Sequence, residues 1–136
     1  MRLAFNRDAE VAIWTADRLG MTIFPPYVAL GVEDDEGRLH GGVVFNDWNG
    51  SNLEITICGP GAMYRGIIRD VFRYVFIQAG ANRLTAKTRR GNKLMRRMLP
   101  KFGFEFEATL KAYYGVERDN DALVFRLTPD AALKWM

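Results

Sequence analysis

A strand that runs into a glycine-rich break and then into a long amphipathic helix is the feature that most constrains this chain. Alternating apolar and polar residues predict a half-buried strand over residues 52–58. Gly59-Pro60-Gly61 ends it, and apolar residues at helical spacing predict a helix over 62–79, followed by a strand at 83–88. A strand–helix–strand unit of this kind implies a parallel pair joined by a right-handed crossover.

The remaining segments complete an α/β sandwich of helices on a sheet. Asn6 is expected to cap the first helix and Gly20 to close it. Short turns, including Asn49-Gly50, favour antiparallel pairing of the early strands. The full pattern predicts helices at 6–19 and 92–101 and strands at 27–33, 39–45, 104–113 and 122–127. We therefore predict one domain over residues 1–136 with a mixed, mostly antiparallel sheet and flanking helices.

Composition narrows the class of protein. Hydrophobic residues make up 49% and charged residues 26%, which is ordinary globular composition. No apolar run is long enough for a bilayer and the N-terminus lacks a secretory signal, so we expect a cytoplasmic protein without a membrane partner. One cysteine, Cys58, and one histidine, His40, are too few for a zinc site or an intrachain disulfide, so no metal is predicted.

Basic residues gather in one stretch of the sequence. Eight of the 19 Lys and Arg are Arg83, Lys87, Arg89, Arg90, Lys93, Arg96, Arg97 and Lys101. Such a cluster suits a phosphorylated ligand or a nucleic-acid backbone, and equally a solvated face. The glycines at 59–61 raise a related choice, because a strand–helix turn can cradle a pyrophosphate or simply turn the chain.

The second half of the chain resembles a known superfamily. Asn92 precedes Gly103-Phe104 by eleven residues across a basic helix, and Arg97, Lys101 and Glu107 fall in register with the same pattern. The chain thus resembles the GNAT superfamily of acyl-CoA-dependent N-acetyltransferases. It looks most like the ribosomal-protein N-terminal acetyltransferase branch and its short phage-associated members. The likeness extends over about residues 31–127.

The resemblance implies a GNAT fold in which acetyl-CoA is wedged between two splayed parallel strands, here 52–58 and 83–88. Backbone groups at Ile57 and Cys58, with Asn92, would hold the pantetheine arm. The pyrophosphate would be bound by Gly59, Gly61 and Ala62, with Arg65 as a helper.

Two departures from the family pattern bear on activity. The usual pyrophosphate loop is absent, since the nearest match, residues 63–68, ends in Ile68. The tyrosine that many relatives use as general acid is Leu99, and Tyr113 or Tyr114 is the candidate replacement. Glu54 is the candidate general base, because attack on a thioester needs a neutral amine; the alternative is an ordinary polar residue on a half-exposed strand.

The predicted function is transfer of an acetyl group from acetyl-CoA to an amine by direct attack in a ternary complex. The acceptor, a small molecule or a protein N-terminus, is not identified by the sequence. The alternative is a catalytically silent GNAT-fold module that binds nucleic acid or protein through residues 83–101. A third hypothesis joins the two, as acyl transfer onto a nucleic-acid base.

Overall fold

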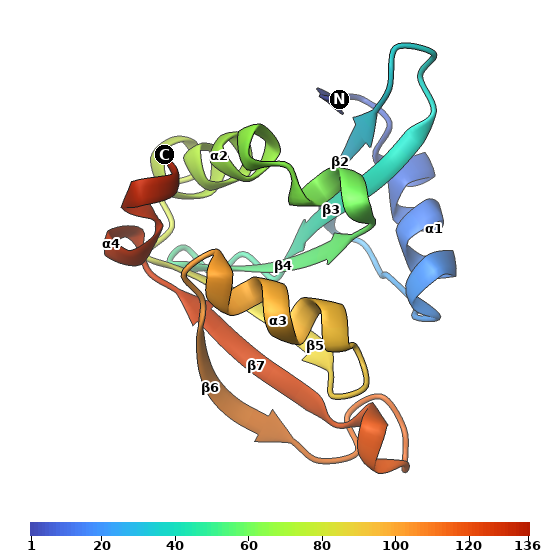
Figure 1. Cartoon of the computed structure of the whole chain (residues 1–136), viewed down its shortest axis with the longest axis vertical. Helices are drawn as coiled ribbons and strands as arrows, with labels where there is room; N and C mark the ends of the chain where they lie inside the picture. The colour runs from blue at the N-terminus through green and yellow to red at the C-terminus, as the bar shows by residue number, and fades with distance from the viewer.

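The computed structural model describes residues 1–136, and a seven-stranded sheet in the order β1-β2-β3-β4-β5-β7-β6 runs through it (Figure 1). The strands are β1 (Arg2–Ala4), β2 (Tyr27–Glu33), β3 (Leu39–Asn46), β4 (Asn52–Cys58), β5 (Arg83–Arg89), β6 (Glu105–Leu110) and β7 (Ala122–Leu127). Every neighbouring pair is antiparallel except β4 and β5. The predicted mixed, mostly antiparallel sheet with one parallel pair is therefore confirmed.

Helices cover both faces of this sheet. They are α1 (Asp8–Leu19), α2 (Arg65–Arg73), α3 (Lys93–Lys101) and α4 (Pro129–Ala132), with single turns at Pro60–Met63, Tyr74–Gln78, Arg118–Asn120 and Leu133–Trp135. Figure 1 shows α1 beside β2 and β3, and α3 over β5 and β7. No helix in the chain is both long enough and apolar enough to cross a membrane.

The main hydrophobic core lies between one face of the sheet and the helices α2 and α3 that cover it. Alternation along β3 sorts its residues: Val43 and Phe45 join the core that includes Phe72 of α2, whereas Val44 packs with Val11 of α1 on the opposite face. Phe72 also meets Phe104 edge-to-face, with ring centroids 6.2 Å apart. The alternation of side chains along β3 therefore determines which of them pack against α2 and which pack against α1.

The helix predicted over residues 62–79 is interrupted, which corrects the expectation. A 3-10 turn occupies Pro60–Met63, Tyr64 is extended (φ −66°, ψ 138°), and α2 begins only at Arg65. The last part, Tyr74–Gln78, widens into a π-turn. The interruption arises because the 59–62 segment packs closely on the start of β3, so the chain must step away before a helix can form.

Three smaller differences have local causes. Asn6 has φ 63° and cannot cap the first helix, which begins at Asp8. The strand predicted over 104–113 ends at Leu110, since Ala112 lies in the left-handed region at φ 57°. β1 has three residues, too few to show alternation. Gly20 does close α1 as predicted, with φ 61° and its N–H bonded to the Ala16 carbonyl.

Candidate functional site

The central parallel pair separates halfway along its length. β4 and β5 are in register from Asn52 opposite Arg83 to Ile55 opposite Ala86, and no further. Beyond that point residues 56–58 pair only with β3, and residues 87–89 pair only with β7. The carboxyl ends of the two central strands therefore diverge, and their facing backbone edges have no strand partner.

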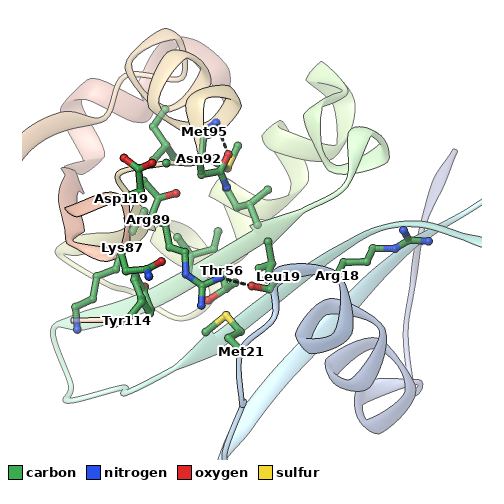
Figure 2. A pocket seen from close by; sticks show the side chains of 17 residues that line it. Arg18, Leu19, Met21, Thr56, Lys87, Arg89, Asn92, Met95, Tyr114 and Asp119 are labelled. Atoms are coloured by element: carbon green, nitrogen blue, oxygen red, sulfur yellow. Dashed lines mark hydrogen bonds between the residues drawn. The ribbon is translucent and has the colours of Figure 1, made fainter. Parts of the chain in front are cut away.

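A cavity of about 340 Å³ occupies the gap (Figure 2). Its walls come from the strand ends, the C-terminus of α1, the N-terminal part of α3 and the loop before β7. The lining residues are Arg18, Leu19, Met21, Ile55, Thr56, Ile57, Ala86, Lys87, Thr88, Arg89, Gly91, Asn92, Met95, Leu99, Tyr114, Asp119 and Asn120. Such a volume lies within the range of small-molecule and cofactor sites.

The α3 residues in the cavity wall carry no acid or base. Asn92 is the N-cap of α3, and its side-chain oxygen accepts a hydrogen bond of 3.2 Å from the Met95 N–H. Met95 and Leu99 are buried and supply an apolar surface. A proton donor for this cavity must therefore come from a residue outside α3.

On the β5 side of the cavity, the lining residue Lys87 forms an ion pair with Glu54. The Lys87 ammonium lies 2.6 Å from Oε1 of Glu54, and each side chain is 23% exposed. The Tyr113 hydroxyl lies 3.5 Å from the same ammonium. Burial acts to lower the pKa of Lys87, but the hydrogen bond and charge of Glu54, with help from Tyr113, raise that pKa overall. Lys87 is therefore a fixed cation at neutral pH.

Arg89 spans the cavity from the end of β5 to the end of α1. Its guanidinium donates to the carbonyls of Leu19 and Gly20, the latter at 3.2 Å, and lies over the Tyr114 ring at 4.9 Å (Figure 2). A cation at a helix C-terminus is favoured by the helix dipole. Burial, with the neighbouring Tyr113, raises the pKa of Tyr114, so its phenol stays protonated.

The glycines predicted to bind a pyrophosphate lie elsewhere. A Cβ on Gly59 or Gly61 would come within 2.7 or 2.8 Å of the His40 carbonyl oxygen, so both positions require glycine for packing on β3. Gly59, Gly61 and Ala62 do not line the cavity. Close packing accounts for this glycine pattern without any ligand.

The other predicted residues divide between the cavity and its surroundings. Ile57 and Asn92 line it. Cys58 is buried beside it, and burial raises the pKa of its thiol. Arg65 stands exposed at the start of α2, over the Trp135 ring at 5.2 Å. Neither Cys58 nor Arg65 is among the residues that line the cavity.

Glu54 and Tyr113 meet the cavity through Lys87, which sequence reasoning had placed only in the basic cluster. Thr56 also lines the cavity and is not among the predicted site residues. Arg89, from the basic cluster, and Met21 line it as well. One signal was available: alternation along β4 puts Thr56 on the same face as Glu54. The contribution of Met21, just after α1, depends on tertiary packing alone.

The basic cluster does not form one binding face. Arg83 pairs with Glu107 at 2.9 Å, Arg90 with Asp121 at 3.6 Å, and Lys87 and Arg89 are engaged as described. Arg96 donates to the Arg90 carbonyl at 3.0 Å. Only the exposed cations Lys93, Arg97 and Lys101, all on α3, lack a protein partner. The structure therefore gives no support to a nucleic-acid-binding module.

Solved structures with the same architecture include those of spermidine N-acetyltransferase SpeG from Vibrio cholerae. One variant aligns with a TM-score of 0.79 at 15% identity over 97% of this chain and 95% of that one. A second gives 0.77 at 14% identity over 98% of both chains, and a third 0.76 at 13% identity over 98% and 97%. No family model and no curated protein matches the sequence itself. The chain thus has the fold of the GNAT superfamily.

Proposed function

We propose that this chain is an N-acetyltransferase that transfers an acetyl group from acetyl-CoA to an amine by direct attack in a ternary complex. The observation that carries the proposal is the separation of β4 and β5 beyond Ile55 and Ala86, which opens the cavity. Backbone N–H and C=O groups need partners, and an amide-bearing arm running between the strands would supply them. Acetyl-CoA has such an arm and supplies the activated acetyl group.

The residues of the cavity fit part of that donor. The unpaired strand edges at residues 56–58 and 87–89, the Asn92 amide and the apolar Met95 suit the pantetheine arm. The Gly59–Gly61 segment packs on the start of β3 and does not line the cavity. We place the pyrophosphate instead at the first turn of α2, from Arg65, where helix N–H groups lack intrahelical partners and Gly66 is exposed.

Catalysis then rests on the side of the cavity facing α1. Glu54 is the base that takes a proton from the acceptor ammonium, directly or through water. Tyr113 or Tyr114 is the proton donor for the leaving thiolate, because Met95 and Leu99 have no acidic group. The amine nitrogen bonds to the carbonyl carbon as the carbon–sulfur bond breaks, and positioning of the two reactants supplies much of the rate.

A finer placement follows from the Asn92 to Phe104 motif, which supports the ribosomal-protein N-terminal acetyltransferase branch or its short phage-associated members. The structural neighbours, by their names, act on spermidine. An amine is the common acceptor group in both cases.

The proposal is tested by calorimetric titration with acetyl-CoA. Thr56→Trp fills the cavity from a half-buried position on β4, whereas Thr109→Trp adds the same bulk to an exposed position on edge strand β6. We expect micromolar binding that persists in Thr109→Trp and is lost in Thr56→Trp. Absence of binding by the unaltered protein, or equal binding by both variants, would overturn the proposal.

A further inference from the structure

The Glu54–Lys87 pair, of which Lys87 lines the cavity and Glu54 lies directly behind it, keeps unused hydrogen-bonding capacity. An ammonium has three donors, and Lys87 directs one to Oε1 of Glu54 at 2.6 Å while the Tyr113 hydroxyl lies at 3.5 Å. The Glu54 carboxylate forms no other hydrogen bond in the chain. A carboxylate can accept about four hydrogen bonds, so both members of the pair have room for a ligand.

A negative and a positive group side by side are complementary to a molecule that carries both charges. We propose that the acceptor is an amino acid, whose ammonium pairs with Glu54 and whose carboxylate pairs with Lys87. This inference rests on the proposed N-acetyltransferase function and names the acceptor class for the same site. It assigns Glu54 as the catalytic base and Lys87 as the residue that determines specificity.

The surrounding charges disfavour a polyamine in this position. Arg18 and Arg89 also line the cavity, so three cations border it. The one carboxylate in the lining is the exposed Asp119. Glu54, which does not itself line the cavity, is already paired with Lys87. A polycation would therefore meet net repulsion, whereas a carboxylate would be attracted.

The same arrangement places the reacting nitrogen next to its base. With the acceptor carboxylate held by Lys87, the ammonium lies at Glu54, which removes one proton. The neutral amine then forms a bond to the thioester carbon and the carbon–sulfur bond breaks. The departing sulfur takes up one proton, so the products are an N-acetyl amino acid and a free thiol, with one further proton released to solvent.

The test compares matched compounds that differ only at the carboxyl group: leucine, leucinamide and 3-methylbutylamine, with spermidine as the polycation. Thiol release from acetyl-CoA and calorimetric binding are both measured. We expect leucine to exceed the other three by about tenfold in kcat/KM and in affinity, equivalent to about 1.4 kcal/mol. Equal or better use of leucinamide, 3-methylbutylamine or spermidine would overturn the assignment.

Variants then ask whether Lys87 is the source of the preference. Lys87→Gln is expected to raise KM for leucine about tenfold relative to KM for 3-methylbutylamine, so that the preference for the carboxylate-bearing compound is lost. Lys87→Arg should restore the preference, and Lys101→Gln, which removes an exposed cation on α3, should not alter it. An equal loss for all four compounds in Lys87→Gln would contradict a carboxylate-binding role.

The calorimetric binding measurements distinguish failure of this inference from failure of the proposed function. Absence of acetyl-CoA binding would sink the acetyltransferase proposal whatever the amines do. If acetyl-CoA binds and no amine is acetylated, leucine must still bind the cofactor-loaded protein more tightly than leucinamide. Equal affinities in that case would reject the amino-acid assignment on its own.

Discussion

The side-chain oxygen of Asn92 accepts a hydrogen bond from the Met95 N–H, so the residue assigned to the acyl donor also begins α3. Two functions on one side chain can be separated by substitution. The cap uses only the amide oxygen, and the NH₂ group remains available to a ligand.

Asn92→Asp keeps a good N-cap and removes the amide donor, whereas Asn92→Ala removes both. We expect Asn92→Ala to lower the free energy of unfolding by about 1 kcal/mol and Asn92→Asp to leave it nearly unchanged. Both should weaken acetyl-CoA binding. Urea unfolding and calorimetry measure the two effects, and unaltered binding in Asn92→Asp would confine this residue to a capping role.

Gly61 is predicted to matter for packing rather than for a ligand. A Cβ there would lie 2.8 Å from the His40 carbonyl oxygen, a backbone atom that cannot give way, so Gly61→Ala should destabilise the fold by about 1–3 kcal/mol. The matched control is Gly66→Ala, where a Cβ meets nothing within 4 Å and a small gain of about 0.5 kcal/mol is expected. Denaturant unfolding measures the free energy of unfolding of the two variants. An unchanged value for Gly61→Ala would refute the packing explanation.

The Asp34 carboxylate gives the protein an acid-sensitive contact. The hydrogen bond from His40 (2.7 Å between Nε2 and Oδ2), and that from the Arg38 backbone N–H, lower the pKa of Asp34 from 3.8 to about 2. A depressed pKa in the folded state contributes stability above pH 3.8 that is lost as pH falls toward about 2. Unfolding free energy should therefore drop across that window, and the drop should be smaller in Asp34→Asn. Parallel pH profiles for the two proteins would contradict this origin.

Arg89 is predicted to anchor the end of α1. Arg89→Met removes the donors to the Leu19 and Gly20 carbonyls while keeping much of the bulk. We expect a loss of about 1–2 kcal/mol and faster hydrogen exchange at Met21, whose N–H bonds to the Ala16 carbonyl. Arg126→Met, which removes a pairing with Glu105 on the exposed edge of the sheet, is the control and should leave Met21 exchange unchanged.

Elements with a clear apolar periodicity or a glycine signal could be predicted from the sequence. Elements whose bounds are set by contacts distant in the sequence could not. The strand at 52–58 and the closure of α1 at Gly20 follow from alternation and from glycine's access to positive φ. The break before Arg65 depends on the His40 backbone, some twenty residues earlier in the chain. No local pattern carries that information, so the sequence predicts a longer helix than the one that forms.

The same distinction applies to the site. Glu54 could be selected because its strand and face were predictable, and Asn92 because it sits in a motif. The Lys87 partner of Glu54 lies on another strand, and its place depends on the parallel register that sets Glu54 opposite Thr85. Without that register, the basic sequence around Lys87 predicts only a solvent-exposed side chain.

The separation of β4 from β5 also divides the sheet mechanically. Strands β1 to β4 form one half and β5, β7 and β6 the other, joined edge to edge only from Asn52–Arg83 to Ile55–Ala86. A molecule bound between the strand ends would complete that seam with its own amide groups. Binding of such a molecule would therefore hold the two halves of the sheet together, because its backbone-like amide groups would take the place of a missing strand.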